Sequence, residues 1–259
     1  MFGFLIKKSF WDFWDKMGLM ILMNLTLMLI GAGAVYLFVA LYELGMVVPA
    51  FAVFVLFGAL FFLILGAHTR ACTEVINNRS FSPKAWYGFL KEKAKKSLLF
   101  YVLVLGFSVV IYTAMNFYGS VGGHAIFLGA FFFMFWVTLF LLFAAGYFFP
   151  LSNIMDDPFG KNIKKCFVLF FDNSGVSIGA SLLGTLLFSL SFLTAFLVPG
   201  VSAAVILWEN LMKLLMLKYD YLEENPEADK KKIPWVILLR DERENLGERG
   251  FRDMIRPWK

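Results

Sequence analysis

Some residue types are scarce in this 259-residue chain, and each scarcity excludes a class of protein. The two cysteines, Cys72 and Cys166, are too few for a disulfide framework. The two histidines, His68 and His124, have no second histidine or cysteine at metal-ligand spacing, so we expect no metal site. Charged residues make up 17% of the chain, against about 25% in soluble domains. This composition argues against a soluble globular protein.

The sequence motifs of enzymes are also missing. No P-loop, zinc-protease motif, nucleophile elbow or dinucleotide fingerprint occurs in the chain. Asp156 and Asp157 form a carboxylate pair, but Pro158 follows them directly, which is typical of a helix start. We therefore expect no catalytic site, no cofactor and no enzymatic activity.

Apolar residues make up 60% of the chain and gather in long runs. A helix needs about 20 mostly apolar residues to cross the hydrocarbon of a bilayer. Six segments meet this requirement or nearly so, and they cover residues 18–42, 46–66, 97–115, 125–149, 176–198 and 201–217. The sequence therefore predicts an all-α membrane protein with six transmembrane helices in three hairpins. Residues 1–219 would form the transmembrane domain and residues 220–259 a charged tail.

The basic residues all fall on one side of this arrangement. With six spans, the 24 lysines and arginines lie in the N-terminal segment, in the loops after the second and fourth spans, and from Lys213 onward. The positive-inside rule then places both termini in the cytoplasm. We keep the last span in the prediction because, without it, all the basic residues from Lys213 onward would lie outside the cytoplasm. Pro199 and Gly200 suit the tight turn that it requires.

Three basic amphipathic stretches, beginning near Phe2, Ser82 and Asp157, each precede a pair of spans. Helices of this kind lie in the membrane interface with lysines toward the lipid headgroups. The lysines that we expect to contact anionic headgroups are Lys91, Lys95, Lys96, Lys161, Lys164 and Lys165. The alternative is that each stretch only extends the span that follows it. Either arrangement indicates contact with lipid rather than with nucleic acid.

The last span carries polar residues where lipid-facing helices have few. Glu209 lies about 12 Å along this helix, and an ionisable group at such a depth is costly unless it is paired or hydrated. Lys213 follows at a spacing that suits an ion pair with Glu209. Asn210, and Asn24 from the first span, would complete a polar cluster if the helices meet. Three interpretations stay open: a structural ion pair, a site that couples to protons or substrate, and a contact with a partner.

The chain resembles the YesL family of bacterial membrane proteins, whose function is not established. The similarity rests on an aromatic N-terminus and on five short segments, which are Lys16–Gly18, Leu22–Leu25, Phe89–Leu99, Phe149–Leu151 and Pro199-Gly200, followed by a closing helix to Tyr219. The resemblance implies a six-helix protein of the bacterial cytoplasmic (inner) membrane. It also implies an association with carbohydrate uptake systems, which YesL-like proteins often accompany. It implies no active site.

Two functions are compatible with these patterns. The first is a non-enzymatic accessory or scaffold protein of a bacterial transport or envelope system, because nearly all the polar sequence lies on one face. Its partners would be membrane lipids together with a transport or envelope protein, or further copies of itself. The second is a small transporter or channel with a midplane polar site around Glu209, which requires a cavity that reaches this residue.

Overall fold

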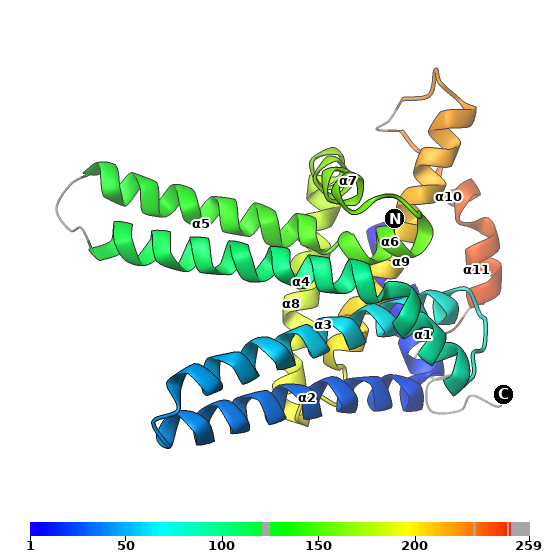
Figure 1. Ribbon diagram of the computed structural model, residues 1–259. Coiled ribbons are helices and arrows are strands. Elements are labelled where there is room, and N and C mark those ends of the chain that lie inside the picture. Colours follow the sequence, from blue (N-terminus) through cyan, green and yellow to red (C-terminus); the bar gives the residue numbers. More distant parts are fainter. Residues whose placement is uncertain (121–124, 230–231, 248, 250–259) are drawn as a thin grey trace.

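The computed structural model describes residues 1–120, 125–229, 232–247 and 249, and their regular structure is helical (Figure 1). The helices are α1 (Phe2–Asp15), α2 (Met17–Glu43), α3 (Val47–Ile76), α4 (Pro83–Ser120), α5 (Ala125–Ala145), α6 (Phe148–Ile154), α7 (Phe159–Asp172), α8 (Ser174–Ser191), the 3₁₀ turn η1 (Phe192–Thr194), α9 (Gly200–Glu224), α10 (Trp235–Leu238) and α11 (Arg240–Leu246).

Six helical segments are long and apolar enough to cross a membrane. They are α2, α3, α4, the segment Phe127–Ile154 within α5 and α6, the segment Ser174–Thr194 of α8 and η1, and α9. Each contains most of one of the six predicted spans. The prediction of an all-α fold with six such helices is confirmed, and the chain is a multi-pass membrane protein by helix length and hydropathy.

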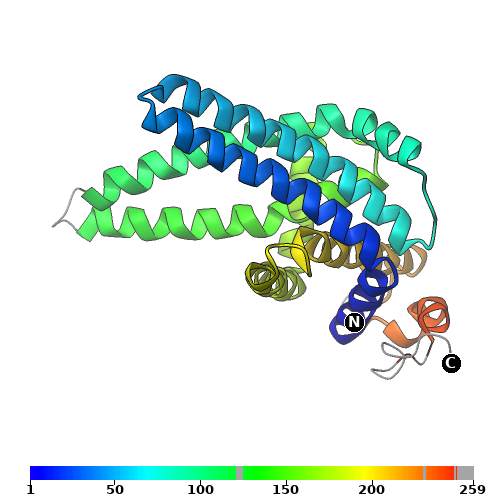
Figure 2. The same cartoon turned by 90° about the horizontal axis from the view of Figure 1, so that it is seen from below.

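The helices form two layers. Helices α2 and α3 run side by side, as do α4 and α5, and the two pairs diverge toward one end of the molecule (Figure 1). Seen from below, these four helices form one layer, while α8 and α9 form the second (Figure 2). Helix α8 runs across the two pairs in Figure 1 and is nearly end-on in Figure 2. Helices α1 and α11 lie at the end of the molecule that is farthest from the α2–α3 turn (Figure 1). We call this end, which contains α1 and α11, the basic end.

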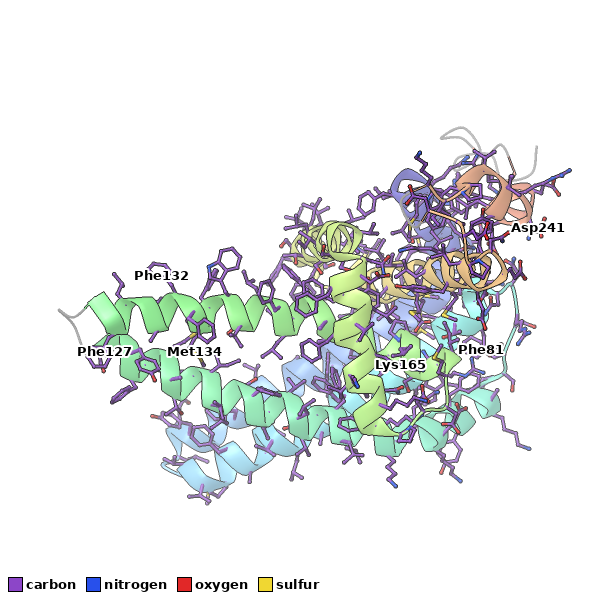
Figure 3. The ribbon with its side chains drawn as sticks, turned by 90° about the horizontal axis from the view of Figure 1, so that it is seen from above. Phe81, Phe127, Phe132, Met134, Lys165 and Asp241 are labelled. Atoms are coloured by element: carbon purple, nitrogen blue, oxygen red, sulfur yellow. The ribbon has the colours of Figure 1, made fainter. Side chains whose placement is uncertain are left out.

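The three amphipathic stretches adopt two different arrangements. Helices α1 and α7 are separate from the spans that follow them. Helix α7 is end-on in Figure 1 and lengthwise in Figure 3, so it lies across the direction of α4 and α5. The stretch after Ser82 instead continues into its span as the single 38-residue helix α4. For this stretch, the alternative of a simple extension of the span is correct.

Helix α9 is the core of the molecule. In the most apolar 18-residue stretch of α9, 61% of the residues are buried, against 6 to 22% in the corresponding stretches of the other five segments. Its inward residues pack on the aromatic rings of Tyr147, Phe148 and Phe170, and the rings of Phe100 and Phe148 stack 3.9 Å apart. A helix that is mostly surrounded by protein can carry polar groups that a lipid-facing helix cannot, because other side chains satisfy them.

The predicted tight turn before α9 is present and is held by Asn24. Gly200 begins the helix with a φ of +65°, which few residues other than glycine adopt. The Asn24 amide nitrogen donates to the carbonyl oxygens of Leu197 and Pro199, at 2.9 and 3.0 Å. The Asn24 carbonyl oxygen accepts from the backbone N–H and the hydroxyl of Ser202, both at 2.8 Å. One side chain from α2 therefore fixes both sides of the turn.

A small residue of α8 allows close packing on α1. A methyl group added at Gly179 would lie 3.0 Å from the Phe2 ring of α1. The hydroxyl groups of Ser177, Ser181 and Thr185 bond to carbonyl oxygens of the preceding turn. These bonds satisfy the hydroxyls within their own helix, and the Ser177 hydroxyl also lies 2.6 Å from the Tyr147 hydroxyl.

The tail folds back on the basic end. Leu239 is fully buried and Leu246 nearly so, whereas Val236 and Ile237 of α10 are 70% and 72% exposed. Helix α9 itself continues to Glu224, beyond the boundary expected at residue 219. The tail sequence contains two apolar segments, 233–239 and 251–258, and the first of them docks in part on the helices. The second, at 251–258, lies outside the described residues.

Candidate functional site

The clearest candidate site is the buried carboxylate of Glu209, halfway along α9. The side chain is 1% exposed and lies between α3 and α6. Its Oε1 atom accepts a hydrogen bond from the Asn153 amide at 2.7 Å. Its Oε2 atom lies 3.0 Å from the Thr73 hydroxyl, whose one proton is shared between Glu209 and the Thr69 carbonyl oxygen, also at 3.0 Å. A carboxylate that is this deeply buried is costly, and these two bonds offset part of the cost.

Neither direct partner of Glu209 carries a charge. Arg70 and Lys93 are the nearest cationic side chains that act on it electrostatically. The Arg70 guanidinium lies 2.8 Å from the Glu74 carboxylate, and the Lys93 ammonium lies 3.0 Å from the Glu92 carboxylate. Lys93 also donates to the Ser152 carbonyl oxygen at 2.9 Å. Each cation therefore has an acid of its own, and within the described chain Glu209 has no ion-pair partner.

Glu209 also lines a cavity of about 220 Å³ between the two helix layers. The walls come from α3, α4, the junction of α5 and α6, and α9. The lining residues are Phe62, Leu65, Thr69, Phe100, Ala145, Gly146, Phe149, Pro150, Val201, Ala204, Val205, Trp208 and Glu209. Glu209 is thus the acidic group of a largely apolar and aromatic chamber.

The predicted polar cluster does not form as one unit. The interpretation of Glu209 and Lys213 as an ion pair is wrong, because the Lys213 ammonium lies 2.6 Å from the carboxylate of Glu242 in the tail. The Asn210 amide donates to Asp12 at 2.8 Å, and Asn24 holds the turn before α9. Residues at successive positions of a helix point in different directions, so Glu209 and Asn210 meet different neighbours.

Lys213 and Asn210 belong to a clamp that joins α1, α9 and α11. Its members are Lys8, Asp12, Asn210, Lys213 and Glu242. The Lys8 ammonium is 4% exposed and lies 3.1 Å from Asp12 and 3.3 Å from Glu242. Burial alone would raise the pKa of Glu242, but the bond from Lys213 and the charge of Lys8 hold that pKa below its usual value. Burial raises the pKa of Asp12, against the attraction of Lys8.

The lysines predicted to contact lipid headgroups fall into two groups. Lys96 pairs with Asp156 at 2.9 Å, and Asp157 pairs with Lys161 at 2.8 Å and with Lys165 at 2.5 Å. Lys165 is labelled on α7 in Figure 3. The second group is exposed and consists of Lys91, Lys95 and Lys164. Lys91 lies over the Tyr87 ring at 4.7 Å. Contact of these lysines with headgroups stays a prediction.

Metal-binding and thiol chemistry find little basis in the described part of the chain. No group of three or more histidine, cysteine or acidic side chains is placed there to hold a metal ion. His124 lies outside the described residues. Cys72 and Cys166 are both free and buried, and burial raises the pKa of the Cys166 thiol to about 12. A thiol with so high a pKa is a poor nucleophile at neutral pH.

Sequence reasoning missed both hydrogen-bond donors of Glu209. Thr73 lies 136 residues away in the chain, and Asn153 lies 56 residues away. Both lie outside the predicted spans, Thr73 after the span 46–66 and Asn153 after the span 125–149. The signal that could have found them is that a buried acid requires donors, which directs the search to polar residues just after other spans as well as within them.

The Thr73 hydroxyl provides a first test of the site. Thr73→Val is expected to lower the free energy of unfolding by about 1–2 kcal/mol, because the isosteric side chain leaves a buried carboxylate with one donor fewer. Thr73→Ser keeps the hydroxyl and should lose much less. Thermal unfolding in detergent, followed by a thiol-reactive dye that reports the exposure of Cys72 and Cys166, measures the difference. Equal losses in the two variants would contradict the hydrogen bond.

Fold and site together define a multi-pass helical membrane protein with a buried carboxylate at a cavity between its helix layers. Comparisons with protein-family models, with curated proteins and with solved structures found no match to this chain. The resemblance to the YesL family therefore stays a prediction.

Proposed function

We propose that this protein is a small transporter of the bacterial cytoplasmic membrane and that its binding site is the Glu209 cavity. One observation carries the proposal: a carboxylate that is 1% exposed and has only neutral direct partners lines a cavity of about 220 Å³ between two layers of apolar helices. Ionisable residues within membrane-spanning helices are costly, and they commonly mark substrate or proton pathways.

The position of the cavity supports this proposal. Glu209 is the tenth residue of the 25-residue helix α9, and from it the cavity extends along the helix past Val205 to Val201, into the apolar part of the predicted span. Transporter sites typically lie near the middle of the membrane, between helix groups that can move against each other. The two layers of this protein offer such a boundary, because the walls of the cavity come from both of them (Figure 2).

A reactive cysteine in the cavity wall tests the proposal. In a chain with Cys72→Ala and Cys166→Ala, Ala204→Cys places a thiol on the lining, while Ala180→Cys places one in the fully buried core of α8 as a matched control. A membrane-impermeant thiosulfonate reagent is applied to right-side-out and to inside-out vesicles. We expect Ala204→Cys to react in both preparations, and at least about tenfold faster than Ala180→Cys, because a transporter opens its site to each side in turn.

Two results would overturn the transporter. If Ala204→Cys reacts no faster than Ala180→Cys in either preparation, the cavity is closed to water. If it reacts from one side alone, the site is a one-sided binding pocket and not a transport site. Unfolding midpoints of both variants verify that the thiols report on folded protein.

A second candidate is an accessory protein of a transport or envelope system, as the YesL resemblance implies. The observation in its favour is the exposed apolar pair Val236 and Ile237 on α10 of the folded tail. If this pair holds a partner, the double variant Val236→Ser, Ile237→Ser should lose a transport component that otherwise co-purifies in mild detergent. Recovery of this protein alone from both the parent and the variant would remove the basis of the accessory role.

A further inference from the structure

The walls of the Glu209 cavity are unusually rich in aromatic rings. Four lining residues are aromatic, namely Phe62, Phe100, Phe149 and Trp208. They come from α3, α4, α6 and α9, so rings line the chamber from both helix layers. Such walls bind an apolar body, and the faces of the rings also attract a cation.

The polar groups of the cavity region are mostly hydrogen-bond acceptors. The lining contributes the carboxyl group of Glu209, the hydroxyl of Thr69 and one donor, the indole N–H of Trp208, and the Thr69 proton is donated to the Gly66 carbonyl oxygen at 2.9 Å. Next to Glu209, the Asn153 amide donates to the carboxylate. The buried Asn153 Oδ1 has no hydrogen-bond partner within the described part of the chain. Asn153 does not itself line the cavity, so a ligand that bonds to Glu209 reaches this free acceptor only beside the carboxylate.

The charge of the site also favours a ligand that carries N–H donors and a positive charge. Arg70 and Lys93 each lie within 3.0 Å of another carboxylate, Glu74 and Glu92 respectively, so they do not neutralise Glu209 by contact. An anionic ligand would place a second negative charge beside Glu209 in a medium of low dielectric constant, which is strongly unfavourable. A cationic ligand would supply the ion-pair partner that the carboxylate lacks.

We infer that the Glu209 cavity binds a small organic ammonium ion with an apolar or aromatic body. The inference rests on the proposed function, in that it takes this cavity as the binding site. The ammonium group donates to Glu209 and to Asn153, and the hydrocarbon body packs among the four rings. Such a ligand reaches the cavity from water or from the headgroup region, where amphiphilic amines concentrate.

Three probes of similar shape and different charge test the ligand class. Benzylamine is cationic at neutral pH, benzyl alcohol is neutral and benzoate is anionic. Binding to the purified full-length protein in detergent is measured by calorimetry. We expect benzylamine to bind at least about tenfold more tightly than either other probe, because a charge-assisted hydrogen bond contributes about 1.5–3 kcal/mol.

The variant Glu209→Gln should remove this preference. The amide keeps the shape of the side chain and can bond to Thr73 and Asn153, so the protein stays folded while benzylamine binding weakens about 10- to 100-fold. The control is Glu224→Gln, at the exposed end of the same helix, which should leave binding unchanged. The unfolding midpoint of each variant verifies that a loss of binding is not a loss of fold.

The inference is overturned if benzyl alcohol or benzoate binds as tightly as benzylamine, if none of the three probes binds, or if folded Glu209→Gln binds benzylamine as well as the parent does. These outcomes are separate from failure of the proposed function, because the reaction of Ala204→Cys with a thiol reagent does not depend on which ligand the site prefers. A cavity that is labelled from both sides but shows no preference for the cation rejects the ammonium ligand alone.

Discussion

Gly200→Ala is expected to lower the free energy of unfolding by roughly 3 kcal/mol or more, enough to deplete the folded protein in the membrane. A non-glycine residue at a φ of +65° costs about 1–2 kcal/mol. The added methyl group would also collide with the Asn24 side-chain amide. Asn24 would then have to give up hydrogen bonds to the turn, each of which contributes about 0.5–1.5 kcal/mol.

Gly31→Ala is the matched control for this substitution. Gly31 lies on α2, two turns from Asn24, and a methyl group added there meets no atom within 4 Å. Alanine in a helix is more favourable than glycine, so this variant should be as stable as the parent or slightly more so. Both variants are compared by yield of monodisperse protein and by dye-reported unfolding. A Gly200→Ala variant that unfolds at the same temperature as Gly31→Ala would refute the role of the turn.

Glu242→Gln is expected to release the tail from the basic end. Glu242 joins Lys213 at 2.6 Å and Lys8 at 3.3 Å, and both lysines lose this partner in the variant. Loss of a partly buried charge pair destabilises by about 1.5–3 kcal/mol, so limited proteolysis within residues 225–239 should become about 10- to 100-fold faster. The control is Glu244→Gln on the same helix, because Glu244 pairs with Arg240 at the surface.

The clamp should also depend on pH, with a sign set by Glu242. Its pKa in the docked tail lies below the usual value, so docking is stabilised above the usual pKa of a glutamate and weakens as the pH falls through the lowered one. Asp12 opposes this trend, since its raised pKa makes its protonation favour the docked state. The contribution of Glu242 is isolated by comparison with Glu242→Gln: as the pH falls, tail cleavage by an acid-tolerant protease should accelerate more in the parent than in this variant. If Glu242→Gln is cleaved in the tail at the same rate as the parent at neutral pH, the clamp is ruled out.

The architecture could be predicted from the sequence because two strong physical signals coincide in it. Long apolar runs define the membrane-crossing helices, and the one-sided lysines and arginines define how many there are. Even the weakest span was predicted, on charge alone, and it is α9, the core of the molecule. Glu209, Asn210 and Lys213 make α9 less apolar than the other spans. The helix tolerates them because most of its neighbours are protein and not lipid.

The partners of the polar residues could not be predicted in the same way. Glu209 and Lys213 have a spacing that favours an ion pair on an isolated helix, yet each is bound by residues from distant segments. Tertiary contacts outweigh a local pair, because a buried acid gains more from fixed donors than from a flexible lysine at the surface. The direction of α8 across the other helices was also beyond reach, since hydropathy gives the length of a span but not its packing angle.

The clamp between the two ends of the chain has a consequence for the order of folding. Helix α1 leaves the ribosome before α9 and α11, yet these two later helices supply Asn210 and Glu242, which contact Asp12 and Lys8. Until they arrive, Lys8 and Asp12 have only each other as partners, and burial of this pair without its further hydrogen bonds is unfavourable, so the two charges stay in contact with water at the membrane surface. Assembly of the basic end is therefore a late, long-range event, and a chain that stalls before residue 242 would expose α1 to quality-control proteases.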